Sequence, residues 1–241
     1  MQSNPDLLIR RSGISLPLIG FYDAPDAAPF APLIAPQPKT RNCVFAFFHR
    51  WLEGYTLHLT SDNFGCGGAG RWLFGQETRN RQDFIKFLVD EEGLKASHSL
   101  MGKWIEQAKP YQLDHPNLLI GPLKPALYQF LKTVTFFVNP DQLSLLMIGA
   151  QYESAPEDPS PVIAPFGSGC SQLAPLFPDI TIPRAIIGGT DIAMRQYLPA
   201  NLLAFTVTRP MFERLCRLDD RSFLFKPFWQ RLRAARSQSQ S

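Results

Sequence analysis

Apolar side chains recur along the chain with two periods, and each period predicts a different kind of element. Short apolar runs, some alternating with polar residues, predict strands at residues 14–22, 55–60, 118–123, 133–138, 162–166, 182–187 and 202–208. Apolar side chains spaced three or four residues apart predict amphipathic helices at residues 43–53, 80–92, 100–108, 139–150 and 210–216. Because strands alternate with helices, we expect an α/β (or α+β) fold in which helices flank a mixed sheet.

A weak repeat runs through this pattern. A strand, a polar residue, a proline and an amphipathic helix follow one another at residues 133–150 and again at 202–218. The runs FGC at 64–66 and FGSGC at 166–170 also resemble each other, with the second cysteine displaced by two residues. Short matches of this kind also arise by chance. They are consistent with an internal strand–helix duplication inside one domain that spans residues 1–241.

Three segments depart from the alternation of strands and helices. Residues 23–40 contain five prolines and little polarity, and we interpret them as an ordered surface loop or a mobile flap. Residues 222–236 predict a basic C-terminal helix that docks on the domain with a solvated basic face. An acidic partner, RNA or a membrane surface are the alternatives for that helix. The polar residues 237–241 predict a disordered tail.

Composition and charge narrow the functional classes. The 241 residues are 45% apolar and 19% charged, and their net charge of +3 is too mild to indicate nucleic-acid binding. No apolar run reaches the length of a membrane span, so we expect none. The N-terminal sequence lacks the pattern of a signal peptide, and we therefore expect a cytoplasmic protein. The oligomeric state does not follow from one sequence.

The four cysteines are spread widely and none forms a CxxC pair, so the strong sequence signature of zinc is missing. In a reducing compartment they are free thiols or ligands rather than a disulfide framework. Cys216 lies on the apolar face of its predicted helix, which favours a role in the core. Cys43 precedes a predicted helix, a position that stabilises a thiolate. Cys66 and Cys170 lie among glycines. This context favours a role as a ligand or nucleophile more than at the other cysteines, although burial as a small apolar group is the alternative.

Three glycine-rich loops follow predicted strands, at residues 65–70, 167–169 and 188–189. In open α/β sheets, ligands bind where loops leave the carboxyl ends of strands. Glycine lets the backbone approach a ligand closely, and N–H groups at a helix start attract anions. If the loops converge, they frame a pocket with two thiols and many backbone donors. The candidate ligand-binding residues are Gly65, Cys66, Gly67, Gly68, Gly169, Cys170, Gly188, Gly189 and Thr190.

Each of these features also has an ordinary structural interpretation. Glycines in short loops are most often turns, and an isolated cysteine is most often a small buried apolar group. No loop matches the GxxxxGKS/T phosphate-binding motif, no GxSxG motif is present, and the four histidines show no metal-binding spacing. His58 lies on the polar side of its predicted strand, where a solvent-facing position is favoured over a site.

The order of several short motifs resembles a known prokaryotic family. RNC at residues 41–43 opens a predicted helix, GCGGA at 65–69 follows a strand, and GC at 169–170 follows a later strand. IP at 182–183 precedes a strand that ends in two glycines, and LLAFTVTRPMFERL closes the region. Over roughly residues 10–220, this order resembles the uncharacterised family catalogued as domain of unknown function 169. The resemblance implies no activity. It implies only that Cys43, Cys66 and Cys170 match positions where the family places cysteine.

Three hypotheses follow for function, and the sequence does not decide whether the protein is an enzyme. In the leading hypothesis, Cys66 and Cys170, with Cys43 as a third thiol, bind a soft metal such as zinc, an iron–sulfur cluster, or a small electrophilic or anionic molecule. In the second, Cys66 is the nucleophile or redox thiol of an enzyme, activated by loop N–H groups and Arg71. In the third, the glycine loops are turns and the proline-rich segment or the basic helix binds a partner.

Overall fold

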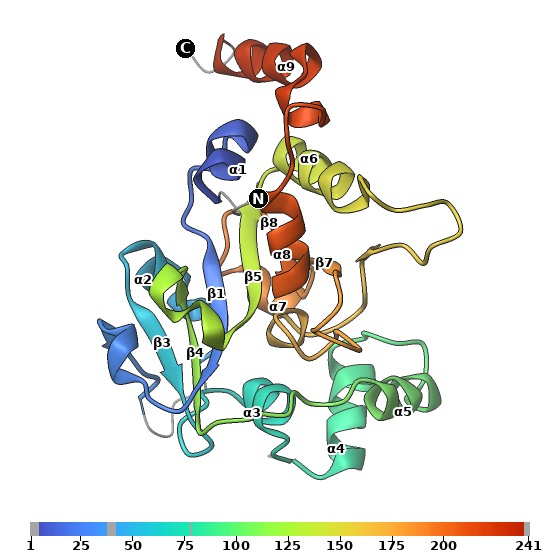
Figure 1. Ribbon diagram of the computed structural model, residues 1–241. Helices are drawn as coiled ribbons and strands as arrows, with labels where there is room; N and C mark the ends of the chain where they lie inside the picture. Colours follow the sequence, from blue (N-terminus) through green and yellow to red (C-terminus); the bar gives the residue numbers. More distant parts are fainter. Residues whose placement is uncertain (1–4, 38–41, 78, 239–241) are drawn as a thin grey trace.

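One mixed sheet forms the centre of the protein (Figure 1). The computed structural model describes residues 5–37, 42–77 and 79–238, and the eight strands within them lie in the order β2-β3-β4-β1-β5-β8-β7-β6. The strands are β1 (Ile19–Ala24), β2 (Leu33–Ile34), β3 (Thr56–Leu59), β4 (Asn117–Pro122), β5 (Leu131–Val138), β6 (Val162–Ile163), β7 (Ala185–Gly188) and β8 (Leu203–Thr208). The predicted α/β fold with a mixed sheet is confirmed.

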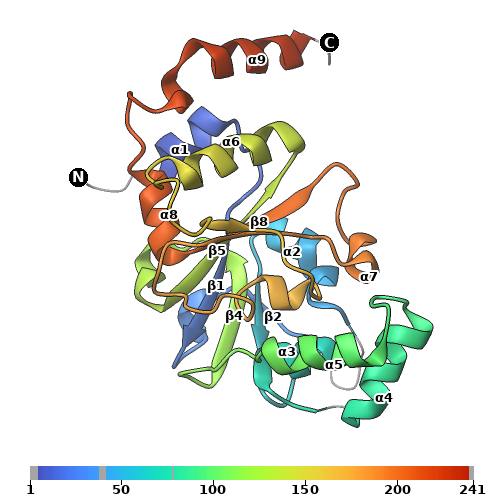
Figure 2. The same ribbon diagram turned by 90° about the vertical axis from the view of Figure 1, so that its right-hand side faces the viewer.

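Helices cover both faces of this sheet (Figure 2). One face carries α1 (Pro5–Ser12), α6 (Pro140–Gln151), α8 (Arg209–Cys216) and the short turns η1 (Ala28–Phe30), η4 (Pro125–Phe130) and η6 (Phe223–Phe225). The other carries η2 (Val44–Phe47), α2 (Phe48–Leu52), α3 (Gly67–Phe74), η5 (Cys170–Gln172) and α7 (Ile192–Arg195). We call the second face the cysteine face, because three of the four cysteines lie on it.

Two further helical units lie outside these layers. The cap, residues 79–107, contains α4 (Arg81–Lys86), a π-helix η3 (Phe87–Glu91) and α5 (His98–Gln107), and it projects from the cysteine face (Figure 2). The C-terminal helix α9 (Pro227–Gln238) docks on α1, where Trp229 Nε1 donates to the Arg11 carbonyl at 2.6 Å. Arg233 also donates to the Arg10 and Arg11 carbonyls.

Each half of the sheet repeats the same arrangement of strands. In the first half β2 is parallel to β3, and β4 and β1 follow in antiparallel pairs. In the second half β6 is parallel to β7, and β8 and β5 follow in antiparallel pairs. The halves meet where β1 pairs antiparallel with β5. The sheet therefore has the strand order of an internal duplication about a two-fold axis, with β1 equivalent to β5 and β3 equivalent to β7.

This repeat is not the one that the sequence predicts. Residues 133–150 contain β5 and α6, and residues 202–218 contain β8 and α8. In the sheet, β5 corresponds to β1 and β8 corresponds to β4. The predicted pair therefore joins two units at different positions of the fold. They look alike in sequence because both are a buried strand followed by a proline-initiated helix that covers the same face.

The central strands hold the two layers apart because neighbouring side chains point to opposite faces. Along β1, Phe21 joins the core of the cysteine face and Tyr22 joins the core of the other face. Along β5, Phe137 and Phe136 divide in the same way. Phe137 meets the rings of Phe45 and Phe48 edge-on and stacks on Trp51 at a centroid distance of 6.3 Å. This aromatic cluster holds η2 and α2 on the sheet.

Several predicted boundaries are wrong, and the reason is strand pairing. The strand predicted at 14–22 begins only at Ile19, where pairing with β4 and β5 starts. The strand predicted at 162–166 is limited to β6, and Gly188 ends β7 instead of starting a loop. The helix predicted at 43–53 divides into η2 and α2. At the strands predicted at 14–22 and 162–166, the local apolar pattern continues past the residues that make ladder hydrogen bonds.

Other differences concern loops and the C-terminus. The glycine loop predicted at 65–70 turns into α3 already at Gly67. The described part of the proline-rich segment contains η1 and β2, and Phe30 within it is fully buried. Its residues 38–40 lie outside the described residues. The basic helix α9 continues through Gln238, into the tail predicted as disordered, and residues 239–241 lie outside the described part of the chain.

A buried carboxylate anchors the segment that returns from the cap to β4. Asp23 of β1 is fully buried and accepts hydrogen bonds from the backbone N–H groups of Asp114 and His115 at 2.8 and 2.9 Å. Its carboxylate also lies 3.2 Å from His115 Nδ1 and accepts the Tyr111 hydroxyl at 3.2 Å. A buried carboxylate needs such partners, so Asp23 holds residues 111–115 to the sheet.

A buried amide joins two loops of the second half. Gln172 is 1% exposed, and its Oε1 accepts the Gly189 N–H at 2.9 Å. Its Nε2 donates to Thr190 Oγ1 at 2.9 Å and to the Pro165 carbonyl at 3.4 Å. One side chain therefore ties the segment before η5 to the segment after β7.

Replacing this amide should loosen both loops. We expect Gln172→Leu to lower the free energy of unfolding by about 1–3 kcal/mol, because the buried Gly189 N–H loses its acceptor. Chemical denaturation followed by circular dichroism measures the change. Gln151→Leu is the matched control, since Gln151 is exposed, and its effect should stay within about 0.5 kcal/mol. Equal stability of the two variants would contradict this role.

Candidate functional site

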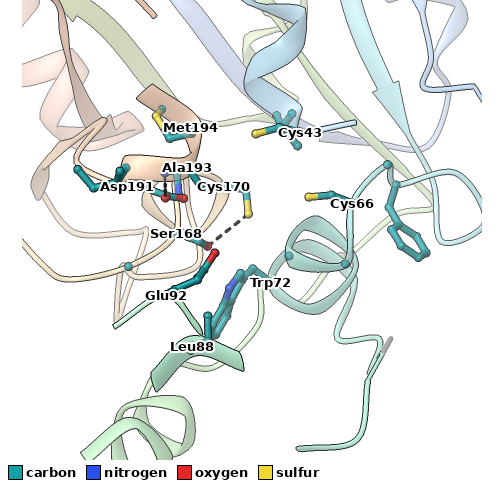
Figure 3. A pocket seen from close by; sticks show the side chains of 18 of the residues that line it. Cys43, Cys66, Trp72, Leu88, Glu92, Ser168, Cys170, Asp191, Ala193 and Met194 are labelled. Atoms are coloured by element: carbon teal, nitrogen blue, oxygen red, sulfur yellow. Dashed lines mark hydrogen bonds between the residues drawn. The ribbon is translucent and has the colours of Figure 1, made fainter. Parts of the chain in front are cut away.

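A cavity of about 720 Å³ opens on the cysteine face (Figure 3). Its walls come from the segment before α3, the segment before η5, the start of α7 and the inner side of the cap. A volume in this range is typical of pockets that bind small organic molecules. The cavity is therefore the candidate site, and its wall combines elements from both halves of the sheet.

Three of the predicted cysteines line this one cavity. Cys43 immediately precedes η2, Cys66 precedes α3, and Cys170 begins η5. Figure 3 shows their side chains approaching the cavity from separate segments. Cys216 lies on α8 in the core of the opposite face. The structure thus brings together Cys43, Cys66 and Cys170 at one cavity and leaves Cys216 apart.

The internal repeat relates these positions to one another. In the sequence, Cys43 lies in the connection from β2 to its parallel neighbour β3. Cys170 lies in the connection from β6 to β7, the equivalent parallel pair. Cys43 immediately precedes a 3₁₀-helix, and Cys170 is the first residue of one. Cys66, after β3, precedes α3 as its N-cap, and Asp191, after β7, precedes α7 as its N-cap. At these equivalent positions the first half of the sheet contributes Cys43 and Cys66 to the cavity, and the second half contributes Cys170 and Asp191.

The turn into α3 depends on glycine at one position. Gly65 has φ +81°, and a Cβ there would lie 2.5 Å from the Asn42 carbonyl oxygen. The turn lets Cys66 Sγ accept the Ala69 N–H at 3.5 Å. Gly67 and Gly68 line the cavity, and their N–H groups donate to no acceptor within the described residues. Free N–H groups at a helix start are donors for a ligand oxygen.

Burial keeps two of the three thiols protonated. It raises the pKa of Cys43 to about 12, and the charges of Cys66 and Asp191 add to the rise against the opposing N–H groups of Phe45 and Ala46. Burial, followed by the charge of Cys66, raises the pKa of Cys170 well above its ordinary value, although a hydrogen bond from Ser168 opposes the rise. Cys43 and Cys170 are therefore neutral thiols at physiological pH, and neutral thiols are poor nucleophiles.

The metal hypotheses find no support in the geometry. Among the described residues, no group of three histidine, cysteine, aspartate or glutamate side chains is arranged to hold a metal ion. The histidines lie away from the cavity. His58 Nε2 lies 2.8 Å from Asn117 Oδ1, His98 pairs with Asp90, and His115 pairs with Asp23. The zinc and iron–sulfur interpretations therefore rest on the presence of three cysteines alone.

The glycine-loop predictions divide into two groups. Gly65, Gly67, Gly68, Gly169 and Thr190 line the cavity together with Cys66 and Cys170. Gly169 has a steric reason to lack a side chain, because its Cβ would lie 2.8 Å from Met194 and 2.9 Å from Phe45. Gly188 and Gly189 do not line the cavity. A Cβ at Gly188 would lie 3.1 Å from Gln172 Oε1, so both glycines pack on the Gln172 amide.

The sequence did not predict the cap side of the cavity. The cap contributes mainly aromatic and aliphatic side chains, namely Phe84, Phe87, Leu88, Leu94 and Trp104. Trp104 meets both Trp72 and Phe166 edge-on, at centroid distances of 5.0 and 4.9 Å. In sequence these residues form ordinary helix stripes that predict core packing. Trp104 lies on the stripe that α5 was predicted to bury, so periodicity alone could not separate a cavity wall from a core.

The fold and the cavity define an α/β protein with a mixed sheet and a cysteine-lined cavity. A family model described as uncharacterised ArCR, domain of unknown function 169, matches residues 18–217, so the chain belongs to that family, as its motif order predicted. No curated protein and no solved structure matches the chain. Within the described residues, every helix is too short or too polar to traverse a lipid bilayer.

The thiol environments predict an order of reactivity. At pH 8 only about one part in ten thousand of Cys43 is thiolate if its pKa is about 12, and Cys170 and Cys216 are buried. We therefore expect iodoacetamide to alkylate Cys66 first, because it is partly exposed at the cavity surface. Peptide mass spectrometry at timed intervals measures the order. Alkylation of Cys216 or Cys43 before Cys66 would contradict this description of the site.

Proposed function

We propose that the protein binds a small organic molecule in this cavity, in contact with the thiols of Cys43, Cys66 and Cys170. The observation that carries the proposal is convergence: three segments far apart in the sequence meet at one hollow of ligand size. A core normally closes such a volume, because empty space forfeits dispersion contacts. An open cavity with aromatic walls and free backbone donors is typical of a binding site.

The wall chemistry favours an organic occupant over a metal ion or cluster. Aromatic and aliphatic side chains from the cap supply a large apolar surface, and glycines on the opposite side expose backbone N–H groups. The apolar wall suits a molecule with a flat apolar body, and the N–H groups can donate to an acceptor atom where the molecule has one. Cys43 and Cys170 are protonated at neutral pH, so they act as polarisable apolar surface rather than as ready ligands.

A second candidate is thiol chemistry at Cys66. Its sulfur lies at the N-terminal end of α3 and on the cavity wall, so a bound electrophile could reach it. In this version Cys66 is the nucleophile and the neighbouring thiols are spectators. Cys66→Ser separates the candidates, because a binding protein retains much of its affinity without the thiol whereas a thiol-dependent enzyme loses its reaction.

A cavity-filling substitution tests the binding proposal. Ala193, at the start of α7, lines the cavity and is exposed, so Ala193→Trp should fill the opening without disturbing the core. The neutral dye Nile red, followed by fluorescence, should bind the unmodified protein and bind Ala193→Trp at least about tenfold more weakly. The Ala193→Trp substitution should also slow the alkylation of Cys66.

The matched control is Ala200→Trp, because Ala200 is exposed in the same region and does not line the cavity. This variant should bind Nile red as the unmodified protein does. Equal binding by Ala193→Trp and Ala200→Trp would overturn the proposal.

A further inference from the structure

The charged side chains that line the cavity are unbalanced. Among the described residues, three carboxylates line it, those of Asp62, Glu92 and Asp191, against one guanidinium, that of Arg79. Cys43 and Cys170 add no negative charge at neutral pH, because burial raises the pKa of each thiol. The lining therefore has an excess of negative charge, and a negatively charged occupant would meet repulsion in it.

Two of these carboxylates belong to different parts of the molecule. Glu92 follows the π-helix of the cap, whereas Asp191 precedes α7 on the body of the protein. The two charges are close enough that Asp191 contributes to a raised pKa of Glu92, after burial, and the two effects outweigh the opposing charge of Arg79. Two like charges therefore line one cavity, Glu92 from the cap and Asp191 from the body.

The two carboxylates differ in how their oxygens are used. Asp191 accepts the N–H groups of Gly169 and Ala193, both at 2.9 Å, and these bonds fix its position. The carboxylate of Glu92 makes no hydrogen bond or ion pair within the described residues, although Arg79 lies near it. Glu92 therefore has free acceptor capacity at the cavity wall.

The part of the cap that carries Glu92 lies at the surface. Neither α4 nor the π-helix contains a buried residue, and a short π-helix often marks a functional site. Gly93, which follows Glu92, has φ +64°. A positive charge between Glu92 and Asp191 would offset the repulsion between the two carboxylates.

The aromatic wall also suits a cation. Cap and loop rings in this region already bind cations of the protein: Lys95 Nζ lies 4.0 Å from the centroid of the Phe166 ring, and Arg79 lies over Phe87 at 4.5 Å. Trp104 and Tyr197 also line the cavity, and neither has such a cation within the described part of the chain. Aromatic faces attract organic ammonium groups most strongly when both are shielded from water.

We propose that the occupant of the cavity is an organic cation, a protonated amine on an aromatic or apolar body, whose ammonium group lies between Glu92 and Asp191. This inference rests on the proposed binding function and adds the class of ligand. This class differs from the anionic ligand considered in the sequence analysis, since among the described residues the carboxylates that line the cavity outnumber the guanidinium.

Three compounds that share the indole ring and differ in net charge test the proposal by isothermal titration calorimetry. They are tryptamine, which is cationic, tryptophol, which is neutral, and indole-3-propionate, which is anionic. We expect tryptamine to bind about tenfold more tightly than tryptophol, and indole-3-propionate to bind most weakly. The proposal fails if tryptamine binds no better than tryptophol, which includes the case in which none of the three binds.

A pair of isosteric variants tests the position of the charge. Glu92→Gln should weaken tryptamine about tenfold and change tryptophol by less than about twofold, because only the ammonium loses a partner. Glu91→Gln is the matched control, since Glu91 is exposed on the same π-helix and does not line the cavity, and it should leave both affinities unchanged. An equal loss of tryptamine and tryptophol in Glu92→Gln would overturn the assignment.

The outcomes separate this inference from the binding function on which it rests. Nile red carries no charge, so its sensitivity to Ala193→Trp reports the cavity and not the carboxylates. If Nile red binding fails that test, the binding function itself falls. If Nile red passes and tryptamine shows no advantage over tryptophol, only the cationic ligand class falls.

Discussion

The antiparallel pairing of β1 with β5 joins the two halves of the sheet, and the position of the cavity depends on it. Each half contains one parallel strand pair, and the connection between those strands lies on the cysteine face in both halves. Because the halves are related as by a two-fold axis, the two connections approach each other over one face of the sheet. Cys43 immediately precedes the 3₁₀-helix of one connection and Cys170 begins that of the other, and both line one cavity.

The same relation explains why the cavity is asymmetric in chemistry. After β3 the chain enters α3 and then the whole cap, whereas after the equivalent strand β7 it makes only the short helix α7. The helix N-caps are Cys66 in the first case and Asp191 in the second. One wall is therefore soft and apolar and the other carries a fixed carboxylate. An occupant has to satisfy both walls at once, which favours a molecule with an apolar body and one polar end.

Burial and nearby negative charge both raise the pKa values of acidic groups that line the cavity. Burial raises the pKa of Cys43 and of Cys170, and Asp191 adds to both rises. The charge of Asp191 also raises the pKa of Glu92, which lines the cavity from the cap. Asp191 caps α7, accepts the Gly169 N–H and disfavours further negative charge nearby.

The sequence by itself determined the kinds of element and several of their ends. Helical and strand periods are local, and so are caps: Asn139 accepts the Gln142 N–H at the start of α6, as the proline-initiated pattern there predicts. The family follows from short motifs in the same way. The glycines around Cys66 and Cys170 lie on two walls of the cavity, where a Cβ at Gly65 or Gly169 would meet neighbouring atoms.

Only the tertiary structure decided which residues meet. The order of strands brings Cys66 and Cys170 to one cavity although about a hundred residues separate them, and no local period encodes that order. Glu92 faces Asp191 for the same reason, and the apolar stripe with Trp104 lines a cavity rather than a solid core because of where the cap lies. Side-chain patterns record what each element buries, but pairing and packing between distant elements set what it buries against.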